Sequence, residues 1–431
     1  MKLLGLDIGT TTVSAVVVEN GCVLASSTVK NDSFLTSPHP WERVQDPNRI
    51  RALALSSVDA LLQQHPDVER IGVTGQMHGI VYLDQVGAPV SPLYTWQDGR
   101  GDLPAEGGET FVQTLSRLTG YPLATGFGLV THASLQQQGL LPPTAKVFCT
   151  IHDYLAMVLA GSTIPVTDCG DAASMGIFSV KEGIFDLSAM EKAGIDTSYL
   201  PKIAHDEILG YYRGNIAVYP AIGDNQASFL GSVGDDVNAI LVNVGTGSQF
   251  SAYTPNYLAC KGLETRPFPK GGYLVVGSAL CGGRAYALLE TFFRETVEKM
   301  TGTAPESCYD AMGRLLQGEK PANLPILCTQ FQGTREDPQR RGSIQNLSTE
   351  NFTPTHLAWA MVEGMCKELH DMYLAYLQDG GKSARLVGSG NGLRRNPALQ
   401  DAFCRAFGQD LTMSSCMEEA AAGAAIYAGM Q

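Results

Sequence analysis

The sequence predicts a duplicated α/β fold of two domains. A strand, a glycine- and threonine-rich loop and a second strand occur at residues 3–18 and again at 239–254. A strand that runs into a glycine loop also occurs twice, as "ERIGVTGQM" (69–77) and "ARLVGSGNG" (384–392). Such self-similarity indicates an internal duplication. The length of 431 residues suits two domains, each with its own core.

The first half begins with apolar runs separated by turns. Residues 3–7 and 13–18 are rich in β-branched side chains and predict a hairpin. "GCVLASSTV" (21–29) follows an Asn-Gly turn as a third strand. Residues 46–65 start with Asp-Pro and predict a helix, and "RIGVTGQ" (70–76) predicts a short strand. Three strands, a helix and another strand make an α/β layer.

The second half repeats this theme. In "AILVNVGTGSQFSAYT" (239–254), Asn243 takes the place of Asp7, and a Gly-Thr pair again follows. The intervening "GSVGDDVNA" (231–239) is small and acidic, which is typical of a boundary. We therefore expect one domain at residues 1–232 and another at 233–431, with a ligand cleft between them.

The composition excludes several function classes. A formal charge of −13 and a pI near 5.1 argue against a nucleic-acid partner. No apolar stretch approaches the ~18 residues of a membrane span, so no membrane partner is expected. The ten cysteines are scattered and favour reduced thiols and a cytoplasmic location. A homodimer is compatible with the sequence, but no surface pattern selects an oligomeric state.

The loop "DIGTTT" (7–12) has the residue types of a phosphate site. Glycine allows close approach of backbone N–H groups to an anion, and the threonine hydroxyls add donors. The carboxylate of Asp7, at a strand end, suits a hydrated Mg²⁺. The alternative is a tight hairpin turn in which Asp7 caps its own backbone. A second loop, "NVGTGS" (243–248), favours the phosphate interpretation, because two loops could hold a polyphosphate from both sides.

"AIGDNQASF" (221–229) places Asp224 after a short strand, "IAVYPAIG" (216–223). An aspartate at a strand end in a cleft can accept the proton of an attacking hydroxyl, as phosphoryl transfer requires. The alternative is an Asx-turn that opens the following helix.

Two further stretches have residue types that bind carbohydrate. "TGQMHGIVY" (74–82) presents Gln76, Met77 and His78 after a strand. "YTWQDGR" (94–100) presents Trp96 and Asp98, an aromatic face and a carboxylate. The alternative for the second stretch is a core tryptophan and a salt bridge within the loop.

Toward the C-terminus, "VGSGNGLRRNPALQDAF" (387–403) predicts a strand, a glycine loop and a helix, against which an adenine ring could lie. "EEAAAGAAIYAG" (418–429) predicts a helix of small residues. Such a helix allows either an adenosine or a neighbouring helix to approach closely, and tight helix packing is the simpler explanation.

These motifs, taken in order, resemble those of the FGGY carbohydrate kinases. DIGTTT, GQMHG, WQDGR, GDNQA, GTGS, GSGNG and the alanine-rich final helix follow one another as in that family. The resemblance covers essentially the whole chain and implies an actin-like ATPase (ribonuclease H-like) fold. Within the family, TGQMHG, TWQDGR, "ATGFG" (124–128) and "TIHDY" (150–154) most resemble the sedoheptulokinases, and xylulokinases are similar through GQMHG.

The resemblance also implies ATP and Mg²⁺ as cofactors and assigns a role to each matching residue. Asp224 would be the catalytic base and, with Asp7, would face the metal. The residues near ATP would be Gly9, Thr10, Thr11, Thr12, Gly245, Thr246, Gly283, Gly390 and Asn391. The residues of the sugar pocket would be Gln76, Met77, His78, Trp96, Asp98 and Asn225.

The leading expectation is an ATP-dependent kinase that phosphorylates a terminal hydroxyl of a ketose, with sedoheptulose favoured. Xylulose, or another sugar or polyol of the same family, is the nearest alternative. A catalytically silent sensor of nucleotide or sugar and an actin-like filament protein are alternatives of other classes.

Overall fold

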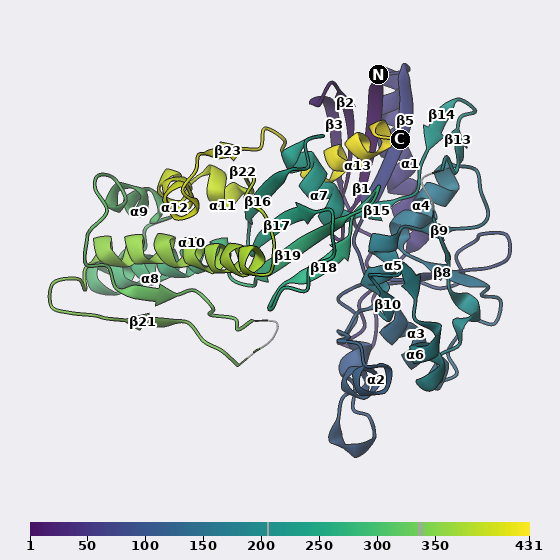
Figure 1. Ribbon diagram of the computed structural model, residues 1–431, viewed down its shortest axis with the longest axis horizontal. Coiled ribbons are helices and arrows are strands. Elements are labelled where there is room, and N and C mark those ends of the chain that lie inside the picture. The colour runs from purple at the N-terminus through teal and green to yellow at the C-terminus, as the bar shows by residue number, and fades with distance from the viewer. Residues whose placement is uncertain (205–206, 335–336, 338) are drawn as a thin grey trace. The chain divides into compact units, whose positions relative to one another are not determined.

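The computed structural model of the chain describes residues 1–204, 207–334, 337 and 339–431 (Figure 1). The chain forms two compact units. The first contains Met1–Asp235, Arg266–Gly272 and Cys416–Gln431, and the second contains Asp236–Thr265 and Tyr273–Ser415. The C-terminal segment thus belongs to the unit formed by the first half of the sequence.

The first unit is built on a mixed seven-stranded sheet with the order β13-β14-β5-β1-β2-β3, in which β15 also pairs with β5. β1 and β2 form the predicted hairpin, β3 continues it, and β5 lies parallel to β1. The predictions for these strands are confirmed, but Pro220 interrupts the expected strand at 216–223, which becomes β14 and β15. The strands are β1 (Lys2–Ile8), β2 (Thr12–Glu19), β3 (Cys22–Lys30), β5 (Val68–Gly75), β13 (Gly210–Tyr212), β14 (Ile216–Val218) and β15 (Ile222–Gly223).

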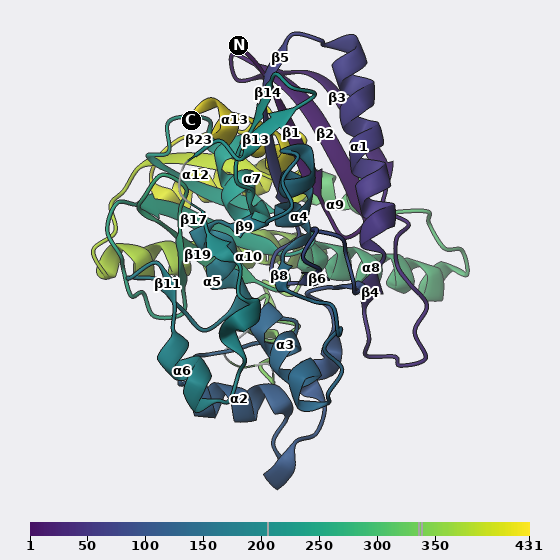
Figure 2. The ribbon, with the colours of Figure 1, turned by 90° about the vertical axis from the view of Figure 1, so that its right-hand side faces the viewer.

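Helices cover both faces of this sheet (Figure 2). α1 (Pro47–Gln64), capped by Asp46 as predicted, and α4 (Ile151–Leu159) pack on one face around Leu4, Leu6 and Ile8. On the other face lie α7 (Asp224–Val233) and the predicted C-terminal helix, α13 (Glu419–Gly429), which pack against each other. The sheet alternates side chains between its faces, so each strand contributes to both layers.

A second apolar core of the first unit lies outside the sheet, around residues such as Tyr82, Leu129 and Phe148. It is enclosed by short strands and helices inserted between β5 and β14. These are β6 (Val81–Leu83), β7 (Leu93–Tyr94), α2 (Phe111–Thr119), α3 (Gly128–Gln137), β8 (Val147–Cys149), β9 (Val166–Thr167), α5 (Cys169–Met175), β10 (Phe178–Ser179), β11 (Ile184–Phe185), α6 (Leu187–Lys192) and β12 (Lys202–Ile203); β7 pairs with β4 (Val44–Gln45).

The second unit contains a six-stranded sheet with the order β18-β19-β17-β16-β22-β23. Its strands are β16 (Ala239–Val244), β17 (Ser248–Thr254), β18 (Glu264–Pro267), β19 (Tyr273–Ala279), β22 (Arg385–Ser389) and β23 (Leu411–Met413). Its helices are α8 (Gly283–Thr301), α9 (Tyr309–Leu315), α10 (Pro354–Gln378), α11 (Asn391–Arg394) and α12 (Pro397–Phe407), and β20 (Ile326–Cys328) pairs with β21 (Ser343–Gln345). The strand, glycine loop and helix predicted at 387–403 are therefore present.

The two sheets confirm the internal duplication. β1 pairs antiparallel with β2 and parallel with β5, and β16 pairs antiparallel with β17 and parallel with β22. Asp7 of β1 and Asn243 of β16 occupy the corresponding place, one residue before the strand ends.

Within the described residues, no helix is both long enough and apolar enough to cross a membrane. All ten cysteines are free thiols.

Candidate active site

Parallel strands of the first unit bring several predicted site residues to one end of the sheet. Asp7 pairs with Thr74, and Gly223 pairs with Gly75, so β1, β5 and β15 end side by side. The backbone N–H of Gln76 donates to the carbonyl of Ile8 at 2.9 Å. Asp7, Gln76 and Asp224, which are far apart in the sequence, therefore gather where α/β sheets commonly bind ligands.

Asp7 and Asp224 are both buried carboxyls whose pKa values are raised. Burial, first of all, and the nearby charges of Asp224 and Glu418 raise the pKa of Asp7 to about 8. Burial also raises the pKa of Asp224, although the charges of His152 and Arg266 oppose that rise. Like charges held this close favour a bound cation or a shared proton. The acidic pair thus has the chemistry of a cation site.

The predicted phosphate loop, residues 9–12, joins β1 to β2 and is partly exposed. The carbonyl of Gly9 accepts a hydrogen bond from Asn31 Nδ2 at 2.9 Å, and that of Thr10 accepts one from Gln45 Nε2 at 3.0 Å. Asn31 and Gln45 are both buried. These two amides bind the loop carbonyls from the buried side and so restrain the backbone conformation that the loop presents to solvent.

Gln76 is almost fully buried and lies against the phosphate loop. Its Nε2 donates to Gln45 Oε1 at 2.8 Å, and its Oε1 accepts from Thr10 Oγ1 at 3.3 Å. Neighbouring Met77 lies close to Gly223, because a Cβ added there would stand 2.5 Å from Met77 Cε. Residues 76–78, called the sugar loop from here on, therefore contact both the phosphate loop and the residue before Asp224.

His78 adopts a left-handed backbone conformation with φ of 74°. Its ring stacks on Phe127 at 4.7 Å between centroids, and Nδ1 lies 2.7 Å from the carbonyl of Ser174. The Ser174 hydroxyl also accepts from the His78 backbone N–H at 3.2 Å. A strained residue held by several contacts is typical of a functional site. Sequence reasoning did not identify Ser174, since nothing near it in the chain points to His78.

Trp96 and Asp98 occupy different environments. Trp96 is 46% exposed, and its Nε1 donates to Thr10 Oγ1 at 3.0 Å. Asp98 has no exposed surface and accepts from Arg100 Nε at 2.5 Å and from the Arg43 backbone at 3.1 Å. The alternative of a salt bridge within the loop holds for Asp98, whereas Trp96 is not a core residue. A sugar contact by either residue stays a prediction.

Asn225 follows Asp224 in the first turn of α7. Its side-chain oxygen is buried and has no hydrogen-bond partner among the residues that the structure describes. A sugar contact by Asn225 also stays a prediction.

Behind this end of the sheet lies a buried cluster of His152, Asp153 and Asp171. One ligand atom from each lies within 4.8 Å of the others, and His152 Nε2 is 2.9 Å from Asp171 Oδ2. A Cβ on Gly75 would stand 3.1 Å from His152 Nδ1, so the cluster adjoins β5. Burial lowers the pKa of His152 and raises that of Asp171, so the two side chains form a buried polar contact between α4 and α5 in which neither charge is favoured. The stretch "TIHDY" contains His152 and Asp153, but nothing in the sequence pointed to Asp171 or to a cluster.

In the second unit, the residues predicted to bind nucleotide also come together. The N–H of Gly283 donates to the carbonyl of Gly245 at 2.8 Å, and that of Arg284 donates to the carbonyl of Thr246 at 3.0 Å. Gly390 has φ of 86°, and a Cβ there would stand 2.5 Å from the carbonyl oxygen of Val244. The close approaches at Gly283 and Gly390 require glycine, and together the contacts place the loop after β16 beside the starts of α8 and α11.

A cavity of about 780 Å³ opens beside these loops within the second unit. Gly283 and Asn391 line it, together with Tyr286 and Tyr309, whose rings stack at 6.1 Å. Burial raises the pKa of Tyr286 to about 12, and charged side chains such as Asp310 and Arg395 line the same cavity. The volume and lining suit a nucleoside, and neither tyrosine was identified from the sequence.

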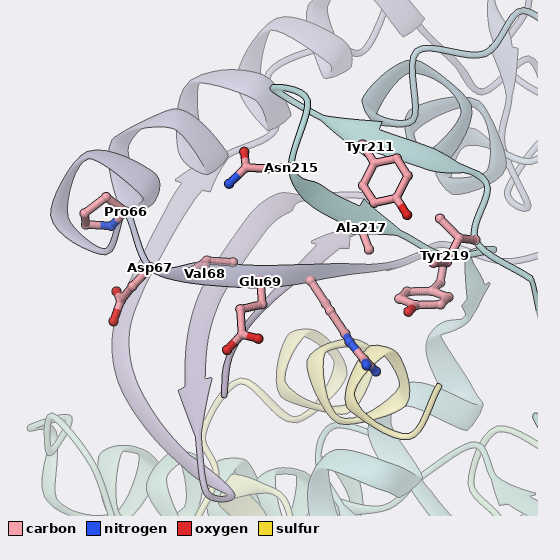
Figure 3. A pocket seen from close by; sticks show the side chains of 10 residues that line it. Pro66, Asp67, Val68, Glu69, Tyr211, Asn215, Ala217 and Tyr219 are labelled. Atoms are coloured by element: carbon pink, nitrogen blue, oxygen red, sulfur yellow. The ribbon is translucent and has the colours of Figure 1, made fainter.

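Another hollow, of about 370 Å³, lies at the opposite end of β5 (Figure 3). Asp67, Tyr211 and Tyr219 are among the residues that line it. It contains none of the predicted site residues.

Comparison with protein families decides the identity. The model of the N-terminal domain of the FGGY family of carbohydrate kinases matches residues 2–242, and that of its C-terminal domain matches residues 240–431. The chain belongs to the FGGY family of carbohydrate kinases. It is therefore an enzyme, a sugar kinase with a sugar and ATP as substrates, rather than a silent sensor or a filament protein.

Relatives of this FGGY kinase match over nearly their whole length. The sedoheptulokinase of Mus musculus is 31% identical over 98% of this chain and 96% of its own, and that of Homo sapiens is 29% identical with the same coverage. The xylulose kinase of Staphylococcus xylosus is 27% identical over 99% of this chain and 90% of its own.

Solved structures show the same fold. Xylulose kinase from Rhodospirillum rubrum has a TM-score of 0.85 at 22% identity and covers 100% of this chain and 90% of its own. Plasmodium falciparum glycerol kinase with ADP has a TM-score of 0.78 at 18% identity, with 100% of this chain and 89% of its own covered. The predicted actin-like ATPase fold is thereby confirmed.

Proposed function

We propose that this FGGY kinase transfers the γ-phosphoryl group of ATP to a terminal hydroxyl of a ketose, most readily converting sedoheptulose to sedoheptulose 7-phosphate. The identity to two sedoheptulokinases over nearly the whole chain supports this substrate. The observation that carries the chemistry is the position of Asp224, which opens α7 beside the Gln76 loop and close to Asp7.

Asp224 acts as the general base in this proposal. The carboxylate accepts the proton of the terminal hydroxyl as the phosphoryl group is transferred. Gln76, Met77, His78 and Asn225 are proposed to orient the sugar, and the exposed face of Trp96 is proposed to pack on its C–H bonds. Alignment of the acceptor contributes much of the rate in such a reaction.

Within the first unit, residues 9–12 are proposed to bind phosphate. Within the second unit, Gly245 and Thr246 are proposed to form a phosphate loop. Gly283, Gly390, Asn391 and the cavity beside them are proposed to hold the nucleoside. Asp7 and Asp224 fit Mg²⁺, because burial raises the pKa of both carboxyls and the charge of Asp224 adds to the rise at Asp7, and a cation would relieve both effects. Mg²⁺ there would neutralise charge on the phosphates. The free cysteines support a proposed cytoplasmic location.

Xylulose is the second candidate substrate, because the xylulose kinase of Staphylococcus xylosus matches 99% of the chain. A panel of ketoses, aldoses and polyols assayed with Mg-ATP tests the proposal. We expect the highest kcat/KM for sedoheptulose, at least about tenfold above xylulose, a difference of about 1.4 kcal/mol in transition-state binding. A higher kcat/KM for xylulose would assign the enzyme to the second substrate, and no turnover of any ketose would exclude both.

A further inference from the structure

A closed triangle of hydrogen bonds joins the sugar loop to the phosphate loop in the first unit. Gln76 Nε2 donates to Gln45 Oε1 at 2.8 Å, and Gln45 Nε2 donates to the carbonyl of Thr10 at 3.0 Å. Thr10 Oγ1 then donates to Gln76 Oε1 at 3.3 Å, which closes the triangle. Each amide uses both its donor and its acceptor, so the three side chains fix one another's orientation.

Gln45 is the one corner of the triangle outside the predicted site. It lies on β4, a short strand that pairs with β7, and has no exposed surface. It therefore cannot contact either substrate. Its two bonds lead to a residue proposed to bind sugar and to a residue proposed to bind phosphate. A fully buried amide with both ends satisfied is costly to disturb, because the freed groups would have no water.

Trp96 extends the triangle toward the exposed side. Its Nε1 donates to Thr10 Oγ1 at 3.0 Å, the same hydroxyl that donates to Gln76. A sugar that packs on the exposed ring of Trp96 and bonds to Gln76 would act on Thr10 from both directions. A change in the position of the Thr10 side chain would then shift the backbone of the phosphate loop, to which Thr10 belongs.

We propose that Gln45 is a positioning residue that couples sugar binding to the conformation of the phosphate loop, so that ketose and ATP bind cooperatively. This inference rests on the proposed function. Asn31, Gln45 and the bond from the Thr10 hydroxyl to Gln76 hold the phosphate loop. A sugar that bonds to Gln76 would restrain this amide further, and the triangle would transmit that restraint to Thr10. The coupling is reciprocal, so ATP also tightens the sugar site.

The test measures ketose affinity by titration calorimetry with and without the unreactive ATP analogue AMP-PNP, in the full-length enzyme. For the wild type we expect the analogue to tighten ketose binding at least about fivefold, within the usual range for linked sites. Gln45→Met keeps the length of the side chain but removes both bonds. In this variant we expect AMP-PNP to tighten ketose binding by less than about twofold; this ratio of ketose affinities with and without AMP-PNP is the coupling factor. We also expect kcat to fall more than either KM rises.

Two further variants separate coupling from folding. Gln64→Met makes the same replacement at an exposed glutamine of α1 and should leave the factor unchanged. Thr10→Val removes the hydroxyl corner, and with it the acceptor of Trp96 Nε1, and it decides the question if Gln45→Met does not fold. Its factor should also fall below about twofold.

The proposal is overturned if AMP-PNP does not change the ketose affinity of the wild type. It is also overturned if a folded Gln45→Met or Thr10→Val variant shows the same coupling factor as the wild type. Failure of the proposed function has a different signature, namely a wild-type enzyme that phosphorylates no ketose. In that case the same factor is measured with whichever sugar or polyol of the panel is turned over.

Discussion

His152 Nε2 lies 2.9 Å from Asp171 Oδ2, and neither side chain has any exposed surface. The pair joins α4 to α5. Burial lowers the pKa of His152, and burial together with the charge of Asp224 raises the pKa of Asp171. The buried environment thus disfavours a charge on either side chain. Each side chain is the polar partner of the other.

Removing Asp171 should therefore destabilise the first unit. Asp171→Ala leaves the buried imidazole without its partner, and we expect the free energy of unfolding to fall by about 1–3 kcal/mol, the cost of an unsatisfied buried polar group. Urea denaturation measures the change. Asp32→Ala breaks an exposed ion pair with Arg49 and serves as the control, with a much smaller effect expected. Equal losses in the two variants would contradict a supporting role for the pair.

The stability of the enzyme should depend on the protonation of Asp153. Burial and the charge of Asp171 raise its pKa to about 7, from about 3.9 in an unfolded chain. Between about pH 4 and pH 7 the folded state holds a proton that the unfolded state has lost, so stability falls as the pH rises through this window. Asp153→Asn should reduce that slope by up to about 1.4 kcal/mol per pH unit. Urea titrations at pH 5, 6, 7 and 8 compare the slopes, and identical slopes would exclude the effect.

Asp224→Asn should abolish most of the activity. Loss of the general base lowers kcat by about 10²–10⁴-fold, while ketose affinity should change by less than about threefold, because the amide keeps the size of the side chain. Steady-state kinetics and calorimetry provide the two measurements. Asp67→Asn, at an exposed aspartate paired with Lys2, should retain wild-type kcat. Near-normal turnover of Asp224→Asn would remove this residue from the proposed mechanism.

Gly283→Ala should weaken ATP binding selectively. The added Cβ would stand 2.4 Å from the Gly245 carbonyl oxygen and would displace the second phosphate loop. We expect KM for ATP to rise about tenfold, or about 1.4 kcal/mol, with KM for the sugar unchanged. Gly313→Ala is the control, since Gly313 lines the same cavity but has open space around its Cβ position. If the two variants have the same KM for ATP, the loop is not the nucleotide site.

Gly423→Ala should destabilise the packing of α13 on α7. A Cβ on Gly423 would stand 1.7 Å from the carbonyl oxygen of Ala227, so the helices would have to separate. We expect a loss of at least about 2 kcal/mol in the free energy of unfolding. Gly313→Ala, in an open helical position of α9, should instead gain about 0.5–1 kcal/mol. Thermal unfolding of both variants checks the opposite signs.

The sequence by itself determined the strands, the glycine loops, the duplication and the position of Asp224 at the start of a helix. These features follow from local periodicity, from turn chemistry and from motifs in a fixed order, all of which a single chain displays. The tight packing of the C-terminal helix was also predictable, because only small residues allow so close an approach.

Tertiary structure alone decided which polar groups are partners. Gln45, Gln76 and Thr10 meet only because β4 and β5 fold beside the same loop, and His152 meets Asp171 only because α4 packs on α5. In the folded chain the carboxylate oxygens of Asp98 accept hydrogen bonds from Arg100 and Arg43, whereas Trp96 is exposed. A hydrogen bond depends on distance and direction between groups distant in the chain, and a residue's chemical type does not specify either.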